Sequence, residues 1–339
     1  MRQNNIFLML LKVFFFSSIL VATSAVRAEL KVVTTIKPLH SLIANVMDGV
    51  GEPALIIEGS TSPHSFTLKP SHAKLLEEAD IIFWVGESIE TFMERPLESI
   101  VKNAEVVEFM EVESINKLKF REESIFEDHD DHDDHDDHDD HDDHDDHDDH
   151  DDHDDHDDHD DHSGHDHHGH AHGEFDAHIW LDPINAKEMV HEIAHELGDL
   201  DPANKNKYEA NAQATIQALD QLVNDIEKGI NKDAKFVVFH DAYQYFEERF
   251  GVRAAGALTL NTDVLPGAKQ IADIQDVIKD RGIKCIFSEP QFNPKIITTI
   301  AEDMNIKTGV FDPLGANIDS NKDLYFKLIQ NLGNELKGC

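Results

Sequence analysis

Histidine is the residue type in this chain that most directly suggests chemistry, because imidazole nitrogens bind divalent transition metals. The chain has 24 histidines among 339 residues. Twelve recur every third residue in a His-Asp-Asp repeat from 129 to 162, and five more follow up to residue 172. The remaining seven are spread along the rest of the sequence. The repeat and the scattered histidines are therefore separate candidates for metal binding.

The repeat predicts a disordered His/Asp-rich loop, over about residues 113–175. A period of three matches neither a helix nor a strand face, the repeat has no apolar residue to bury, and its aspartates repel one another. Mobile imidazoles and carboxylates should collect Zn²⁺, Cu²⁺ or Ni²⁺ at several weak, poorly selective sites. The alternative is a solvated low-complexity expansion without a role. The expected weak ligands are His129, His132, His135, His138, His141, His144, His147, His150, His153, His156, His159, His162, His165, His167, His168, His170 and His172.

Three of the other histidines are predicted to lie at the ends of strands, in loops that face a cleft. His64 follows the second predicted strand, His178 directly precedes a helix, and His240 ends a strand. Asp312 ends the last predicted strand in the same way. Loops at the carboxyl ends of parallel strands face a common cleft. A single loop histidine is more often a surface residue, but these four, two from each half, together predict one specific metal site.

Residues 191–195 read HEIAH, which matches the HExxH signature of zinc proteases. If this stretch is helical, Val190 and Ile193 mark its apolar face and turn His191 and His195 toward solvent. We interpret the two histidines as a surface pair, with a metalloprotease built on this helix as the weaker alternative.

The rest of the chain alternates short apolar runs with helical runs, which predicts an α/β fold. The apolar runs are continuous rather than alternating, as is typical of parallel strands covered on both faces. We therefore predict two lobes, each a roughly four-stranded, mostly parallel sheet with flanking helices. The predicted strands cover residues 32–36, 54–57, 81–85, 105–109, 236–239, 252–258, 285–287 and 308–311.

A long amphipathic helix is predicted between the two halves, over residues 201–231, with Asp201 as its cap and Pro202 in its first turn. Such a helix suggests a rigid spine joining two lobes, although a long helix inside a single domain is the alternative. The predicted organisation is a signal peptide at 1–28, lobes at 29–200 and 232–339, and the connecting helix at 201–231.

Residues 1–28 are predicted to be a secretion signal, because an apolar run leads to the small residues of Val26-Arg27-Ala28. No cysteine lies near this cleavage point, so we expect a periplasmic protein that is not a lipoprotein. The net charge of the chain is −40. Residues 128–172 contain 24 aspartates and no lysine or arginine, so the rest of the chain carries a charge of −16. This charge argues against nucleic acid or an anionic membrane as a partner and favours a cation.

The two cysteines, Cys285 and Cys339, are separated by 54 residues and could pair in an oxidising compartment. A bridge between them would contribute about 4 kcal/mol in the chain-entropy model. Two unpaired thiols are the alternative.

Several motifs resemble those of the metal-specific solute-binding proteins of ABC importers (the cluster A-I, or cluster 9, family), and in particular its zinc branch. The resemblance covers essentially the whole mature chain, and a His/Asp-rich insertion before the second motif histidine is typical of the zinc branch. The motifs are TTIKPL at 34–39, PHSFTLKPS at 63–71, HIWLDP at 178–183, FHDAY at 239–243, SEPQF at 288–292 and DPLG at 312–315.

The resemblance implies two α/β lobes joined by a rigid helix, with zinc bound between them by His64, His178 and His240. Asp312 matches a carboxylate ligand of manganese-type relatives, which implies a fourth or water-mediated ligand. Some zinc members carry an acid directly before the first histidine, but this chain has Pro63 there. Three imidazoles and one oxygen suit tetrahedral Zn²⁺. The resemblance also implies a Cys285–Cys339 disulfide, and we expect Glu289 to order the cleft without touching the metal.

The implied function is high-affinity capture of Zn²⁺, as transported ligand, and its delivery to a cognate ABC permease with its ATPase. We expect a monomer without enzymatic activity. The alternatives are the metalloprotease described above and a metal-buffering protein that acts mainly through the His-rich loop.

Overall fold

The computed structural model describes residues 29–126, 174–260, 262 and 266–339. The predicted signal sequence and the His/Asp repeat, with all of its expected weak ligands, lie outside the described residues. The flanks of the predicted loop are described and lie on the folded body. The N–H of Phe120 donates to the carbonyl of Glu174 at 3.2 Å, and the N–H of Asp176 donates to Leu118 at 2.8 Å. The two ends of the insertion are therefore paired with each other.

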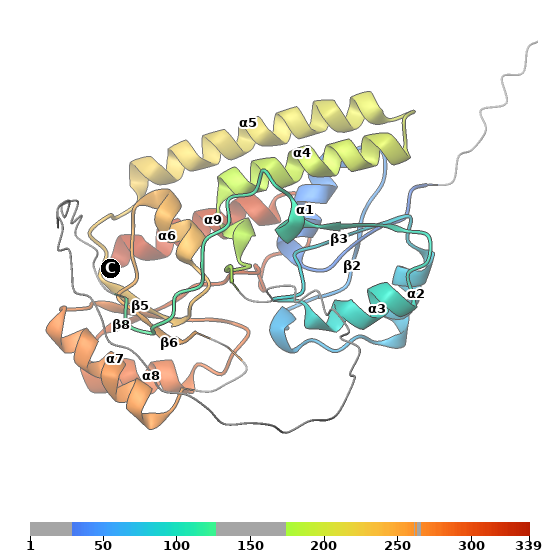
Figure 1. Ribbon diagram of the computed structural model, residues 1–339. Coiled ribbons are helices and arrows are strands. Elements are labelled where there is room, and N and C mark those ends of the chain that lie inside the picture. The colour runs from blue at the N-terminus through green and yellow to red at the C-terminus, as the bar shows by residue number, and fades with distance from the viewer. Residues whose placement is uncertain (1–28, 127–173, 261, 263–265) are drawn as a thin grey trace, which may run out of the picture.

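Two sheets of four parallel strands each are present in the described part of the chain, which confirms the predicted α/β class (Figure 1). The first sheet has the order β2-β1-β3-β4 and consists of β1 (Val32–Thr34), β2 (Ala54–Leu55), β3 (Ile81–Trp84) and β4 (Glu105–Glu108). The second has the order β6-β5-β7-β8 and consists of β5 (Phe236–His240), β6 (Ala257–Thr259), β7 (Cys285–Ser288) and β8 (Lys307–Val310).

Burial is continuous in the central strands β3 and β5 and in the edge strand β6, but not in the edge strands β4 and β8. Every residue of β3 and β5 is buried. The edge strands β4 and β8 are mostly exposed, and Val106 and Val310 have 40% and 47% of their surface accessible. The expectation that all strands are covered on both faces is wrong for these two, whereas β6, at the other edge of the second sheet, is buried throughout.

Helices cover the faces of both sheets. Proline occupies the first turn of α1, α2 and α4, where its missing N–H costs no hydrogen bond. None of the helices in the described residues is both long and apolar enough to cross a membrane. The helices are α1 (Lys37–Val46), α2 (Pro70–Glu78), α3 (Glu94–Ser99), α4 (Pro183–Leu200), α5 (Lys205–Gly229), α6 (Gln244–Phe250), α7 (Ala268–Asp280), α8 (Lys295–Met304) and α9 (Leu324–Glu335).

The predicted long helix is α5, but it begins later than the sequence pattern indicates. It has 25 residues, or about 37 Å at 1.5 Å per residue. Asp201 does not cap it, because the N–H of Asp201 bonds to Leu197 and ends α4. The Asp201 carboxylate accepts a hydrogen bond from Asn204 at 2.6 Å, within the turn that joins the two helices. Pro202 accordingly lies in this turn and not in a helix.

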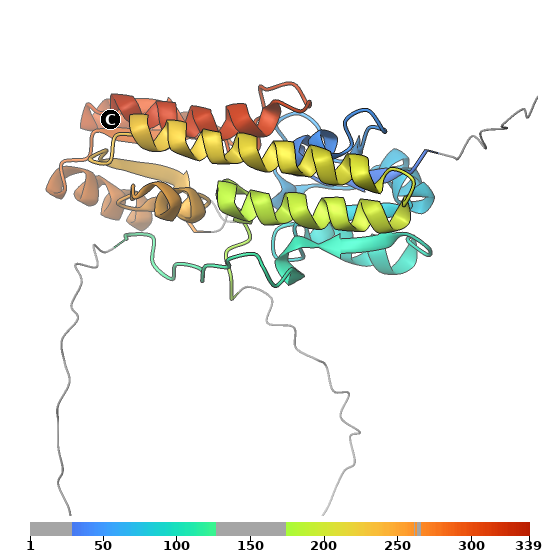
Figure 2. The same cartoon turned by 90° about the horizontal axis from the view of Figure 1, so that it is seen from above.

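One hydrophobic core extends through both halves and the helices beside them. It includes Phe83 of β3, Leu219 of α5 and Phe287 of β7. The α5 helix packs on α1, α4 and α9, and the perpendicular view shows it between α4 and α9 (Figure 2). A second core, which includes Ile274 and Ile300, fills the space between the second sheet and helices α7 and α8. The shared core fixes the two halves relative to each other.

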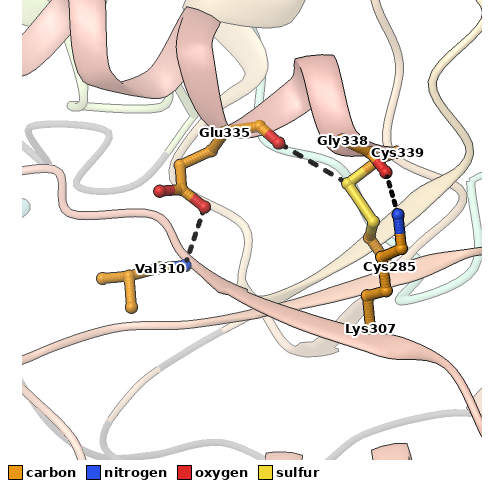
Figure 3. The surroundings of a disulfide bond; sticks show 6 residues. All are labelled: Cys285, Lys307, Val310, Glu335, Gly338 and Cys339. Atoms are coloured by element: carbon orange, nitrogen blue, oxygen red, sulfur yellow. Dashed lines mark hydrogen bonds between the residues drawn. A yellow bond between two sulfur atoms is a disulfide. The ribbon is translucent and has the colours of Figure 1, made fainter.

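A disulfide between Cys285 and Cys339 joins the chain end to the start of β7, which confirms the predicted pairing (Figure 3). The ammonium of Lys307 donates to the carbonyl of Gly338 at 2.8 Å beside it. These contacts hold the end of the chain against the second sheet.

Replacing both cysteines by serine should lower the free energy of unfolding by about 4 kcal/mol, because the bridge closes a loop of 54 residues. Urea unfolding measures this difference. Dithiothreitol should destabilise the unaltered protein and leave the Cys285→Ser/Cys339→Ser variant unchanged. Equal stability of the two proteins would contradict the assigned role of the bridge.

Candidate metal centre

Three histidines from separate elements meet between the two sheets. His64 lies in the 3-10 turn Pro63–Ser65 after β2, and His240 is the last residue of β5. His178 begins the turn Ile179–Leu181 that leads into α4, so it is placed by a helix start and not by a strand end. The Asp182 carboxylate accepts a hydrogen bond from the N–H of Ile184 at 2.8 Å and so caps the start of α4. This bond fixes the end of the turn.

The ring nitrogens of these histidines are spaced for a shared metal ion. One nitrogen from each ring lies within 4.8 Å of the other two. The Nε2 atoms of His178 and His240 are 3.3 Å apart. Two nitrogens bound tetrahedrally to one ion, each at 2.0–2.1 Å, lie about 3.3–3.4 Å from each other. The observed separation therefore suits an ion such as Zn²⁺.

A carboxylate orients each of the two buried histidines. Nδ1 of His178 lies 2.7 Å from Oδ1 of Asp176, and Nδ1 of His240 lies 2.7 Å from Oε1 of Glu289. These contacts assign a proton to Nδ1 of both rings, so each Nε2 carries a lone pair when its ring is neutral. Two lone pairs at 3.3 Å repel each other, so the arrangement favours a cation between them.

His64 completes the group from the more accessible side of the cleft. Its side chain is partly exposed, whereas His178 and His240 are 4% and 3% exposed. The Nε2 atom of His64 is nevertheless buried and has no hydrogen-bond partner among the described residues. A buried nitrogen without a partner is unfavourable unless a ligand binds it. The surrounding walls are largely apolar and include Ile89, Trp180, Phe292 and Leu314.

Burial controls the protonation of the group. Burial and the neighbouring histidines hold the pKa of His64 well below 6.5, and burial and His240 do the same for the pKa of His178. Burial acts to lower the pKa of His240 too, but the carboxylates of Glu289, Asp241 and Asp176 raise it overall. Burial raises the pKa of Asp176 to about 7. Protons therefore compete with a metal ion most strongly at the His240 imidazole.

Asp312 does not belong to this group. In the described residues the converging ligand atoms come from the three histidines alone. The Asp312 carboxylate instead accepts hydrogen bonds from the backbone N–H groups of Leu314, Gly315 and Ala316 at 3.1, 3.0 and 2.6 Å. It thereby folds the loop after β8, part of which lines the cleft.

The HEIAH motif lies on the solvent side of α4. His191 and His195 are exposed, and Nδ1 of His195 lies 2.9 Å from the adjacent Glu196. Neither belongs to the group of converging ligand atoms found in the described residues. The interpretation of these histidines as a surface pair is confirmed.

Two residues that act around the site are not singled out by the sequence. Asp176 precedes His178 by two positions, and the same oxygen accepts the His178 N–H at 2.9 Å, so the Asp-Ala-His spacing is a local signal that could identify it. Arg121 pairs with Asp241 across 120 residues, for which no local pattern exists. Glu289 contacts His240, in agreement with its predicted ordering role.

The fold and the site together define a two-lobed metal-binding protein. The model of the family described as "Zinc-uptake complex component A periplasmic" matches residues 32–339. The chain belongs to this family, which is one of transport components and not of enzymes.

The similarity to known relatives extends over nearly the whole chain. The high-affinity zinc uptake system protein ZnuA of Brucella abortus (strain 2308) is 50% identical over 310 residues, which cover 91% of both chains. The protein of the same name from Haemophilus influenzae is 38% identical over 315 residues, covering 92% of this chain and 93% of the other.

Solved structures share the fold at lower identity. A crystal structure of ZnuA aligns with a TM-score of 0.67 at 20% identity, covering 90% of this chain and 98% of the other. The laminin-binding protein of Streptococcus agalactiae aligns with a TM-score of 0.66 at 23% identity, covering 91% and 100%. These two similarities support the architecture alone.

Replacing Glu289 by glutamine should weaken zinc binding about tenfold or more, because His240 loses the anion that fixes its tautomer. Competition with a zinc chelator measures the Kd. The exposed Glu302→Gln is the matched control and should leave the Kd unchanged. An unaltered Kd in Glu289→Gln would show that the carboxylate does not tune the site.

Zinc affinity should fall as the pH decreases, starting above pH 6.5, because His240 has a pKa raised above 6.5 and must lose its proton to bind metal. Below that pKa the apparent Kd should rise about tenfold per pH unit. His64 and His178, with lowered pKa values, add protons only at lower pH. Chelator competition from about pH 8 to 5, corrected for chelator protonation, tests this. A constant Kd would exclude histidine ligation.

Proposed function

We propose that this protein captures Zn²⁺ with high affinity in the periplasm, through His64, His178 and His240, and delivers it to an ABC permease driven by an ATPase. The observation that carries the proposal is the convergence of three imidazoles, with two Nε2 atoms 3.3 Å apart, inside a mostly apolar cleft. Membership of a zinc-uptake family supports zinc as the transported ligand.

The fourth ligand is proposed to be an oxygen, supplied by water or by Asp312. Structural zinc sites have four protein ligands, whereas sites that exchange a ligand commonly have three and an open position. Asp312 could bind directly only after giving up its backbone hydrogen bonds, of which the shortest is 2.6 Å to Ala316. A water molecule requires no such change.

The proposed organisation follows the sequence prediction. Residues 1–28 serve as an export signal without a lipid attachment cysteine, lobes at 29–200 and 232–339 enclose the metal, and residues 201–231 contain the connecting helix. The helical part of that connection is α5, Lys205–Gly229. We propose that the mature protein acts as a monomer. The His/Asp repeat, outside the described residues, is proposed to collect or sense additional metal.

A metal-buffering protein that acts mainly through the repeat is the second candidate, favoured by the 17 histidines in that segment. The two candidates differ in where tight binding resides. The structure of the paired flanks, Phe120 with Glu174, indicates where the repeat can be removed with little disturbance to the folded body.

The deciding experiment is a zinc titration, against a competing chelator, of the mature protein lacking residues 128–172. We expect one tight site, which His64→Ala or His240→Ala should abolish, because each removes one of three nitrogens. Glu192→Gln, in the HEIAH motif of α4, should bind zinc like the parent, because Glu192 does not belong to the converging ligand group of the described residues. Loss of tight binding on deleting the repeat alone would refute the cleft assignment and favour the buffering protein.

A further inference from the structure

Arg121 lies in the segment that leads into the His/Asp-rich repeat. Its side chain binds two carboxylates in the part of the chain that follows His240. Its Nη1 donates to Oδ1 of Asp241 at 2.8 Å, and its Nη2 donates to Oε2 of Glu247 at 2.6 Å. The side chain of Arg121 is 17% exposed, and those of Asp241 and Glu247 are 4% and 2% exposed. One guanidinium thus faces two buried carboxylates, an arrangement that suits its planar pair of donors.

The segment that carries Arg121 is fixed to the second sheet. The N–H of Ala257 donates to the carbonyl of Ser124 at 2.8 Å, and the N–H of Phe126 donates to Ala255 at 3.1 Å. A Cβ atom at Gly256 would lie 2.6 Å from the Ser124 carbonyl oxygen, so glycine is needed for this approach. The segment therefore lies along the outer edge of β6.

The guanidinium has further support within this segment. Its central carbon lies 4.0 Å from the ring centroid of Phe126, which is a cation–π contact. The position of Arg121 is thus determined by its own segment as well as by its two carboxylate partners. A guanidinium held in this way restrains the positions of the carboxylates that it binds.

Asp241 is the residue through which Arg121 reaches the metal site. It directly follows His240, and its N–H donates to the carbonyl of Thr259 at 3.1 Å. The end of β5 is therefore held through its backbone by β6 and through the Asp241 side chain by Arg121. A buried carboxylate that loses its cation must find other partners or water. Either change would displace the residue next to His240.

We propose that Arg121 is a positioning residue for the metal site: it fixes Asp241 and thereby holds the His240 imidazole at the separation from His178 that zinc binding needs. Arg121 itself does not touch the metal. This inference rests on the proposed function, because it concerns the affinity of the same three-histidine site. A lysine at position 121 would supply a charge but not the two parallel donors.

The test compares zinc Kd values of full-length mature variants by competition with a strong chelator, so that weak sites do not contribute. Arg121→Gln should raise the Kd about tenfold to 100-fold, the usual effect of losing a partner that orients a ligand. Arg121→Lys should have an intermediate effect. Lys119→Gln is the matched control, because Lys119 has a side chain that is 74% exposed and pairs with Glu174 at the surface. It should change the Kd less than about twofold.

Cobalt(II) distinguishes positioning from a general loss of stability. Its visible absorption reports ligand geometry and should differ from the parent in folded Arg121→Gln and return toward it in Arg121→Lys. Asp241→Asn, adjacent to His240, should weaken zinc binding more than Glu247→Gln, which removes the other ion pair. A role limited to stability would lower the melting temperature of the variants equally and leave both the Kd and the cobalt spectrum of the folded protein unchanged.

Parent-like Kd and cobalt spectra in Arg121→Gln would overturn the inference. If that variant does not fold, parent-like values in both Arg121→Lys and Asp241→Asn would overturn it. Failure of the proposed function gives a different result, because the unaltered protein would then lack a tight site that His240→Ala removes.

Discussion

The repulsion between imidazole lone pairs in a buried cleft is the constraint on which the rest of this structure depends. His178 and His240 direct Nε2 atoms at each other across 3.3 Å, and a third nitrogen, from His64, is buried without a hydrogen-bond partner in the described residues. With all three rings neutral, such a group of nitrogens favours the binding of a cation. The fold must therefore hold three rings in place against their own repulsion, and the stability of the scaffold serves that purpose.

Bonds across the cleft supply much of this rigidity. The buried ammonium of Lys37, from the first half, donates to the carbonyls of Gly315 and Ile318 in the second half, both at 2.6 Å. The indole N–H of Trp180 donates to the carbonyl of Pro313 at 2.8 Å. With the shared core and the long α5 helix, these bonds oppose the separation of the two sheets. These bonds accordingly help to fix the geometry of the three histidines.

The charges around the site lie outside the group of converging nitrogens in the described residues. The three imidazoles carry no negative charge, and the nearest carboxylates, on Asp176 and Glu289, contact the far nitrogens of their rings. These two carboxylates thus balance the positive charge of a bound ion indirectly, because they polarise the imidazoles that bind it. The Asp312 carboxylate accepts hydrogen bonds from three backbone amides of its own loop.

Local sequence patterns were sufficient for the elements of this protein, and tertiary packing was needed for the partners of its side chains. Apolar runs and helical periodicity depend on neighbouring residues, so the parallel strands, the long helix and the loops carrying His64, His178 and His240 could be predicted, with help from the family resemblance for the ligand set. The Asp201 cap was mispredicted, because the backbone of Asp201 ends α4 and its carboxylate binds Asn204 within the turn, so that α5 begins only at Lys205. The pairing of His240 with Glu289, 49 residues away, and of Arg121 with Asp241, 120 residues away, emerged only from the folded chain. A carboxylate binds whichever donors packing brings to it, which is also why the hydrogen bonds of Asp312 to its own loop could be seen only in the folded chain.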